Sequence, residues 1–217
     1  MITRTSFLPR LYAITDTHRC ALSHAEQVER LIRGGATLIQ LREKHLPSGV
    51  FYQEAEAAVR VARANGVTII INDRADIALA LEADGVHLGQ HDLSSVVARK
   101  LLGPDAIIGV SVHNKEQAID ALALPIDYIG VGPIFPTNSK QNPDPILGLD
   151  GLLDIRRIAG NLPLVAIGGV TRTSAERVLK AGADGIALIS GLLSSPDEIE
   201  ANTRSFLAAT LTDSPGS

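Results

Sequence analysis

Short apolar runs alternate with longer amphipathic stretches along this chain, and the alternation repeats about eight times. The apolar runs are continuous, as in the strands of a parallel sheet whose two faces are both buried. Eight such units in 217 residues favour a closed barrel over an open doubly wound sheet, whose GxGxxG signature is also missing here. Strands are predicted over residues 11–15, 37–41, 67–71, 85–88, 107–110, 128–131, 164–167 and 185–188.

The amphipathic stretches between these runs predict helices, and a glycine follows several of them. An Ala-Asp-Gly turn precedes two strands, at 83–85 and 183–185, which suggests one βα unit used repeatedly. No linker is long enough to separate two domains. We therefore predict an α/β protein with a single (β/α)8 TIM-barrel domain over residues 1–217 and a frayed tail from about residue 212. Helices are predicted over residues 25–33, 51–64, 93–102, 115–122, 152–158 and 174–180.

Composition narrows the class of protein further. Hydrophobic residues make up 45% of the chain and aromatic residues only 3%, which predicts an aliphatic core and argues against a base-stacking surface. The net charge of −4 comes without a block of like charges, so a footprint for nucleic acid or membrane is not expected. The single Cys20 fits a reducing compartment, and no apolar run reaches the ~18 residues that span a bilayer. A soluble cytoplasmic protein is expected.

Polar residues gather where the predicted strands end. Nearly every strand runs at its carboxyl end into charged, amide, histidine or glycine residues unlike those at its start. In a (β/α)8 barrel these ends converge on one face, where the active sites of this fold are found. The alternative is that polar residues simply begin each loop, but this explains poorly why both signs of charge recur there.

The segment Gln40-Leu41-Arg42-Glu43-Lys44 follows the second strand. Strand alternation places Gln40, Arg42 and Lys44 on one face, and Leu41 and Glu43 on the other. An amide beside a forked guanidinium and an ammonium group suits a diphosphate. The alternative is a solvated strand end with an Arg–Glu pair.

Two aspartates, Asp73 and Asp92, follow neighbouring strands, so their carboxylates are expected to approach one another. Mg²⁺ prefers one or two carboxylates together with water and phosphate oxygens, and these residues beside a cationic patch predict a Mg²⁺–diphosphate site. A zinc site built from His87, His91 and Asp92 is an alternative. In another, each aspartate is a first-turn acid of the following helix, favoured by the helix dipole.

Glycines follow the last two strands, at Gly168-Gly169 and at Gly191 after Ser190. They free backbone N–H groups to approach a phosphate, and barrels often bind phosphate at this pair of loops. We therefore predict a second, metal-free anion site. The longest loop, over residues 132–148, holds four prolines and follows the sixth strand; such a loop is typically functional or disordered.

Six motifs in series resemble thiamine-phosphate synthase, and they cover the chain from the second strand to the seventh. They are Gln-Leu-Arg-Glu-Lys at 40–44, Asn-Asp-Arg-Ala-Asp at 72–76, Gly-Val-His-Leu-Gly-Gln-His-Asp at 85–92, Gly-Val-Ser-Val-His at 109–113, Gly-Pro-Ile-Phe-Pro-Thr-Asn-Ser-Lys at 132–140 and Ala-Ile-Gly-Gly-Val at 166–170. No single motif is decisive, but the series in this order is highly specific. One departure is Ser139, where many family members carry Thr.

The resemblance implies a transferase that joins a hydroxymethylpyrimidine diphosphate to a thiazole phosphate, giving thiamine phosphate and diphosphate by dissociative substitution. It implies Asp73 and Asp92 as Mg²⁺ ligands, and Arg42, Lys44, Lys140 and Ser111 as catalytic residues. Ser111 and Lys140 would contact the pyrimidine substrate, and residues 137–139 the thiazole phosphate. The loop carrying Lys140 would close as a lid, and a homodimer is also implied. The substrate-binding residues implied are Gln40, Leu41, Arg42, Glu43, Lys44, Asn72, Ser111, Thr137, Asn138, Ser139, Lys140, Gly169, Ile189 and Ser190.

Rival functions are distinguished by the same residues. A thiazole tautomerase of similar sequence needs neither the paired aspartates nor Lys140, and all three are present here. A non-catalytic phosphate-binding regulatory protein predicts binding without turnover. A phosphosugar isomerase or indole-forming barrel requires a placed acid–base pair, which the sequence does not reveal.

Overall fold

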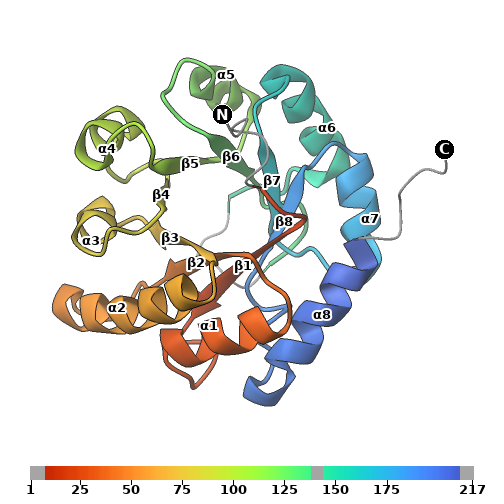
Figure 1. Cartoon of the computed structure of the whole chain (residues 1–217). Coiled ribbons are helices and arrows are strands. Elements are labelled where there is room, and N and C mark those ends of the chain that lie inside the picture. The colour runs from red at the N-terminus through yellow and green to blue at the C-terminus, as the bar shows by residue number, and fades with distance from the viewer. Residues whose placement is uncertain (1–7, 138–143, 211–217) are drawn as a thin grey trace.

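Eight parallel strands close into a barrel in sequence order, and β8 pairs with β1 to complete the ring. The computed structural model describes residues 8–137 and 144–210. Seen along the barrel, the helices form an outer layer around the strands in the order of the chain (Figure 1). The predicted (β/α)8 fold is therefore confirmed. The strands are β1 (Leu11–Asp16), β2 (Leu38–Arg42), β3 (Thr68–Asn72), β4 (Gly85–Leu88), β5 (Ile107–Val112), β6 (Tyr128–Val131), β7 (Leu164–Ile167) and β8 (Gly185–Leu188).

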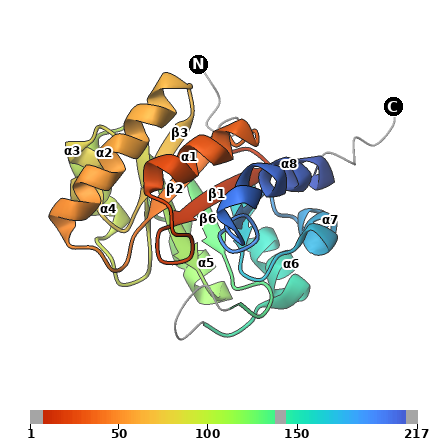
Figure 2. The ribbon, with the colours of Figure 1, turned by 90° about the horizontal axis from the view of Figure 1, so that it is seen from below.

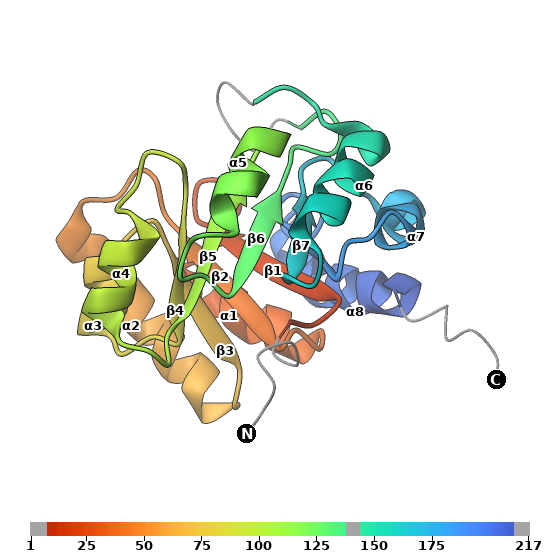
Figure 3. The ribbon, with the colours of Figure 1, turned by 90° about the horizontal axis from the view of Figure 1, so that it is seen from above.

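The helices pack against their neighbours around the ring. Helix α1 lies beside both α2 and α8 (Figure 2), and α5 lies beside α6 (Figure 3). None of the helices in the described part of the chain is long and apolar enough to cross a membrane. The helices are α1 (His24–Arg33), α2 (Ser48–Ala64), α3 (Ala75–Ala80), α4 (Ser95–Leu102), α5 (Lys115–Ala121), α6 (Gly148–Ala159), α7 (Arg172–Lys180) and α8 (Ile199–Thr210), with a short 3₁₀ helix η2 (Pro196–Glu198) before α8.

Several boundaries differ from the prediction for local reasons. Strands β1, β2 and β3 run one residue further, into Asp16, Arg42 and Asn72, so these polar residues belong to the strands themselves. Helix α4 begins at Ser95 because the Ser94 hydroxyl accepts the Val97 N–H and caps it. The tail predicted to fray from about residue 212 lies outside the described residues.

Two helices were not predicted. Helix α3 has only six residues, too few for a periodic pattern to emerge. Helix α8 buries Thr203 and Thr210 beside Ile199 and Phe206, so its buried face is partly polar in sequence. The Thr203 hydroxyl donates to the Ile199 carbonyl at 2.7 Å, which satisfies its donor inside the helix.

The Ala-Asp-Gly turns have a defined role at the amino ends of the strands. The carboxylates of Asp84 and Asp184 accept the backbone N–H groups of Ile69 and Leu164 on the preceding strands, at 2.7 and 2.8 Å. Asp127, which precedes β6, accepts the Ile108 N–H at 2.8 Å in the same way. An aspartate therefore ties each of the three strands β4, β6 and β8 to the strand before it.

The core is mainly aliphatic, as composition predicts, but two tyrosines break the pattern. Tyr12 and Tyr128 are each 1% exposed and are among the largest fully buried side chains. Their rings meet edge to face with centroids 5.9 Å apart inside the barrel. A polar layer is therefore built into the barrel interior beneath the carboxyl ends of the strands.

Replacing Asp127 with Ala should lower the free energy of unfolding by about 3 kcal/mol, because it strips a buried ion pair of one partner. Asp127 accepts from Arg99 Nη2 at 2.6 Å as well as from the Ile108 N–H. Urea unfolding followed by circular dichroism measures the change. The control is Asp120→Ala on the exposed surface of α5, which should shift the midpoint little; equal losses in the two variants would contradict the role assigned to Asp127.

Candidate active site

A cavity of about 550 Å³ opens at the carboxyl ends of the strands. Inward-facing residues of the strands line it, together with residues of the following loops. The predicted site residues that line it come from both halves of the barrel: Gln40, Arg42, Lys44, Asn72, Asp73, Asp92, Ser111, Thr137, Gly169, Ile189 and Ser190. Asn138, Ser139 and Lys140 lie outside the described residues.

Strand alternation on β2 separates the motif at 40–44 into two sets. Gln40, Arg42 and Lys44 line the cavity, as predicted from the pleat. Leu41 is fully buried in the core behind the strand, and Glu43 is buried on the side away from the cavity. The pleat points the side chains of Leu41 and Glu43 away from the cavity, and their assignment to the substrate stays a prediction.

Arg42 is fixed by a carboxylate that the sequence analysis did not single out in this role. Its guanidinium donates to Asp16 Oδ2 at 2.5 Å. Asp16 Oδ1 in turn accepts the backbone N–H groups of His18 and Arg19 at 3.1 and 3.2 Å. Arg42 thus faces the cavity in a preset position.

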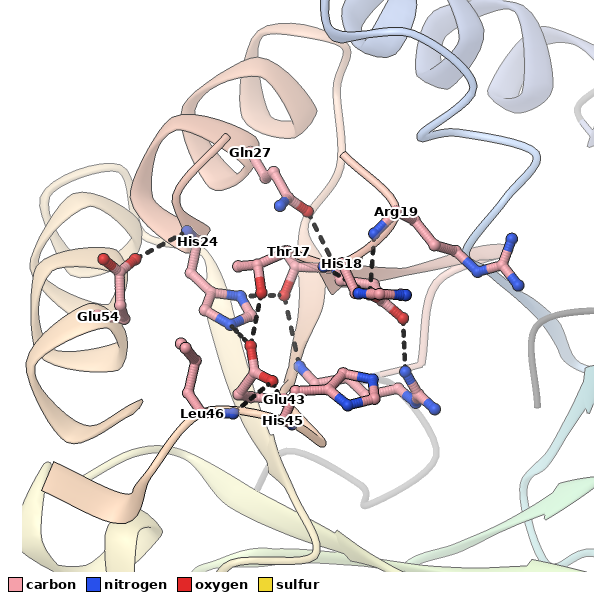
Figure 4. A network of polar contacts seen from close by, with 12 residues as sticks. Thr17, His18, Arg19, His24, Gln27, Glu43, His45, Leu46 and Glu54 are labelled. Carbon is pink, nitrogen blue, oxygen red and sulfur yellow. Dashed lines mark hydrogen bonds and ion pairs between the residues drawn. The ribbon is translucent and has the colours of Figure 1, made fainter. Parts of the chain in front are cut away.

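Glu43 joins the loops that follow β1 and β2 (Figure 4). Its carboxylate accepts the Thr17 hydroxyl at 2.6 Å and the backbone N–H groups of His45 and Leu46 at 2.6 and 3.1 Å. Burial acts to raise the pKa of Glu43, but these hydrogen bonds outweigh it and lower the pKa. Glu43 therefore stays ionised and holds the segment that carries Lys44.

Opposite charges meet where β2, β3 and β4 end. The Lys44 ammonium group contacts the Asp73 carboxylate, and Asp92 is close enough to hydrogen-bond the Asp73 carboxyl group. Burial raises the pKa of Asp73, and Asp92 adds to that effect while Lys44 opposes it. Asp73 also has a positive φ of 62°, which is uncommon for a residue other than glycine and recurs at functional sites.

Asn72 offers an unsatisfied donor at the same level of the barrel. It is 6% exposed, and its Nδ2 group has no hydrogen-bond partner among the described residues. Buried polar groups of folded proteins are nearly always hydrogen-bonded, so an orphaned donor in a cavity wall requires an explanation. A bound acceptor in the cavity would supply the missing partner.

The loops after β7 and β8 form the other half of the cavity wall. Gly168 and Gly169 have φ values of 96° and 65°, and a Cβ at Gly169 would lie 2.4 Å from the Pro136 carbonyl oxygen. Glycine is therefore required both for the backbone conformation and for the close approach of the loop after β6. Ile189 and Ser190 follow β8 and line the same region.

Two residues in the cavity floor, Tyr12 and Tyr128, were not predicted as site residues, and a third, His87, was considered only as a ligand in the alternative zinc site. His87 accepts or donates through both ring nitrogens, to Tyr128 Oη at 2.9 Å and to Ser111 Oγ at 3.0 Å. Desolvation lowers the pKa of His87 to about 4, so the imidazole is neutral near pH 7. Tyr12 completes the group through Tyr128 and Gln40. Only the pleat combined with the strand register could have revealed Tyr12 and Tyr128, which look like core residues in the sequence.

The donor groups distinguish between the two metals considered. The described part of the chain contains no group of three or more His, Cys, Asp or Glu residues placed to hold a metal ion. Because both ring nitrogens of His87 are engaged by hydroxyl groups, the zinc alternative loses a ligand. The Asp73 and Asp92 carboxylates fit a hard cation that keeps most of its ligands as water and phosphate oxygens.

A closed (β/α)8 barrel with a charged cavity at the carboxyl ends of its strands is the architecture of an enzyme that acts on a small molecule. The family model described as thiamine monophosphate synthase matches residues 11–192. The chain therefore belongs to the thiamine monophosphate synthase family and is a transferase.

Individual relatives agree with this assignment. The chain is 44% identical over 189 residues to the thiamine-phosphate synthase of Chloroflexus aurantiacus, covering 87% of each chain. It is 46% identical to that of Clostridium novyi, covering 87% of this chain and 92% of the other. The solved structure of a thiamine phosphate pyrophosphorylase from Pyrococcus furiosus matches with a TM-score of 0.83 and 36% identity, covering 96% of this chain and 98% of that chain.

Acidification should destabilise the protein through its buried histidines. The pKa values of His24 and His87 are both lowered in the folded state, chiefly by desolvation, so the unfolded chain binds more protons as the pH falls. Stability should be fully present above about pH 6.5 and decline as the pH falls from there to about 4, with His87 contributing about 2 kcal/mol after allowance for its side open to the cavity.

Urea midpoints measured across this pH range test the expectation. His87→Gln should flatten part of the decline. The control is His18→Gln, because this ring is exposed in the folded protein as in the unfolded chain. A His87→Gln slope that matches the wild-type slope would contradict the assignment.

Proposed function

We propose that this protein is a thiamine-phosphate synthase that couples 4-amino-2-methyl-5-(diphosphomethyl)pyrimidine with 4-methyl-5-(2-phosphoethyl)thiazole, or its carboxylated form, in the cavity described above. The observation that carries the proposal is the gathering of Arg42, Lys44, Asp73 and Asp92 in one half of the cavity, opposite the glycines of β7 in the other half. The names of the relatives support the same activity.

The reaction breaks the bond between the pyrimidine methylene carbon and the diphosphate oxygen, and the electron pair leaves with the diphosphate. The lone pair of the thiazole nitrogen then forms the new carbon–nitrogen bond, giving thiamine phosphate. No strong general base is required, since the nucleophile already carries its lone pair. The barrier lies in charge that develops on the leaving group, which fixed cations stabilise.

Within the described part of the chain, we assign Arg42 and Lys44 to stabilise the charge on the leaving diphosphate. Asp16 presets the Arg42 guanidinium, so its two donor arms need little reorganisation to meet phosphate oxygens. Glu43 fixes the segment carrying Lys44 by accepting the N–H of the next residue, His45. We assign Ser111 and Asn72 to the pyrimidine substrate; the orphaned Nδ2 of Asn72 supports this assignment.

Asp73 and Asp92 would hold Mg²⁺, which would neutralise charge on the leaving diphosphate when bound. The contact of Lys44 with Asp73 supports assigning its ammonium group to the diphosphate as well. We also assign Thr137, Asn138 and Ser139 to the thiazole phosphate, and Lys140 to the departing diphosphate. The homodimer implied by the resemblance stays a prediction.

The thiazole phosphate is assigned to the loops after β7 and β8. Gly169, Ile189 and Ser190 line this half of the cavity, and the backbone of the two glycines approaches the loop after β6 closely. Small residues, which let backbone N–H groups approach a ligand, suit a phosphate at these loops of a barrel.

Replacing Asp73 with Asn should lower Mg²⁺-dependent turnover by about 100-fold, because a fixed charge at the leaving group is lost. Formation of thiamine phosphate from both substrates and Mg²⁺ is measured by chromatography. Asp76→Asn is the matched control: this carboxylate is exposed in the first turn of α3 and pairs with Arg74. The control variant should keep wild-type turnover.

The same assay decides between the proposal and its rivals. Wild-type protein that binds both substrates but forms no product with any divalent metal would overturn the synthase function and favour a phosphate-binding regulator. If Asp73→Asn weakened thiazole-phosphate binding as much as turnover, the separation into two anion sites would be wrong.

Replacing Ser190 with Ala should weaken thiazole-phosphate binding by about tenfold, the effect of losing one hydrogen bond to a charged group. Binding of the pyrimidine diphosphate should stay unchanged, since Ser190 lies in the other half of the cavity. Calorimetric titration with each substrate alone measures both affinities. Ser194→Ala, in the exposed turn further along the chain, is the control.

A further inference from the structure

A continuous chain of hydrogen bonds crosses the floor of the cavity and joins Gln40 to Ser111. Gln40 Nε2 donates to the Tyr12 hydroxyl at 3.0 Å, and the Tyr12 and Tyr128 hydroxyls lie 2.9 Å apart. Tyr128 contacts His87 Nδ1 at 2.9 Å, and His87 Nε2 contacts Ser111 Oγ at 3.0 Å. Five strands, β1, β2, β4, β5 and β6, contribute one residue each.

The direction of this chain follows from counting protons. Either tyrosine hydroxyl could donate to the other, but Tyr12 already accepts from Gln40 Nε2. Only donation to Tyr128 gives the Tyr12 proton an acceptor among the described residues of this chain. Tyr128 then directs its own proton to His87 Nδ1. A neutral imidazole with an accepting Nδ1 carries its proton on Nε2, so His87 donates to Ser111.

The two ends of the chain therefore present opposite groups to the cavity. Gln40 uses its amide nitrogen on Tyr12, which leaves its carbonyl oxygen as an acceptor. Ser111 accepts from His87, which leaves its hydroxyl proton to be donated. Both residues line the cavity.

Glycines on neighbouring strands make room for this arrangement. A Cβ at Gly109 would lie 2.0 Å from Tyr128 Cζ, and one at Gly130 would lie 2.9 Å from His87 Cε1. The His87 and Tyr128 rings lie with their centroids 5.4 Å apart. Since Tyr12 and Tyr128 are each 1% exposed, bulk water does not compete for their hydroxyls.

We propose that Tyr12, Tyr128 and His87 form a relay of positioning residues that fixes Gln40 as an acceptor and Ser111 as a donor, and so selects a 4-aminopyrimidine over its 4-oxo counterpart. This proposal rests on the proposed function for the identity of the substrate. A 4-aminopyrimidine offers an amino donor beside a ring-nitrogen acceptor, which matches the two ends of the relay. The 4-oxo ring offers a carbonyl acceptor beside an N–H donor, which reverses the match and leaves groups unpaired.

The direction of the relay can be tested without any turnover. Protein labelled with ¹⁵N-histidine is studied by NMR near pH 7, and His87 is assigned by comparison with His87→Gln. The expected spectrum is that of a neutral ring protonated on Nε2. A ring protonated on Nδ1 alone would overturn the proposal, because Nε2 could not then donate a hydrogen bond to Ser111. A ring protonated on both nitrogens would also overturn it, because Nδ1 could not then accept from Tyr128.

The second test interrupts the relay and measures substrate choice. In Tyr128→Phe and Tyr12→Phe, kcat/KM for the aminopyrimidine diphosphate should fall by about tenfold, as expected for the loss of one buried hydrogen bond. The preference for the amino over the 4-oxo substrate should fall by a similar factor, whereas a merely structural defect would lower both substrates together. Tyr52→Phe on α2 is the matched control and should leave the preference unchanged.

A double variant shows whether the effect passes through Ser111. Tyr128→Phe should cost little further preference in a Ser111→Ala background, because the two residues act as one unit. Additive losses, or wild-type preference in both tyrosine variants, would overturn the relay. Urea unfolding shows that each variant is folded before it is assayed.

These outcomes are separable from the proposed function. If the wild-type protein has no synthase activity, the proposed function is wrong. The NMR experiment still determines the direction of the hydrogen bonds in the relay. If the wild-type protein is active but Tyr12→Phe and Tyr128→Phe keep its substrate preference, only the relay proposal is wrong.

Discussion

The pleat of parallel strands closed into a ring decides which side chains of this protein meet. Every second residue of a strand faces the barrel interior, and the register sets the height at which it lies. The register pairs Asn72 with His87, which places polar residues of β3 and β4 at one level, and it pairs Gln40 with Ile14 of β1. A one-residue shift of β2 would exchange Gln40 and Arg42 for Leu41 and Glu43, and the cavity would lose both its amide and its guanidinium.

Arg42 and Lys44, two cations that face the cavity, are each paired with an aspartate, but the two aspartates have different surroundings. Asp16 holds Arg42 from the strand side and is itself held by two backbone N–H groups, so this pair can persist while Arg42 meets an anion. Lys44 pairs with Asp73, whose carboxyl group also faces Asp92. The Arg42 pair therefore uses neither of the carboxylates proposed to hold Mg²⁺, whereas the Lys44 pair uses one of them.

Much of this organisation could be predicted from the sequence, because continuous apolar runs and polar strand ends are local signals. The eight strands, the barrel and the inward set Gln40, Arg42 and Lys44 all follow from periodicity. The assignment of Leu41 and Glu43 to the substrate came from a motif taken as a block. The pleat turns both side chains away from the cavity, and the assignment stays a prediction. Helix α3 is too short for a periodic signal, and the buried threonines of α8 conceal its apolar face.

The hydrogen-bonded floor of the cavity, built from Tyr12, Tyr128 and His87, could not be predicted for a different reason. Tyr12 and Tyr128 lie in apolar runs 116 positions apart, and nothing local shows that their hydroxyls are 2.9 Å from one another. The sequence also gives no sign that Gly109 and Gly130 make room for these rings. Both lie within predicted strands, and only a Cβ built on each shows the clash with Tyr128 or His87. A barrel interior filled with Val, Ile and Leu would be stable but chemically inert. By placing glycine opposite tyrosine and histidine, this chain keeps the interior filled. The hydrogen bonds of the floor then fix which group, Gln40 or Ser111, accepts from a substrate and which donates to it.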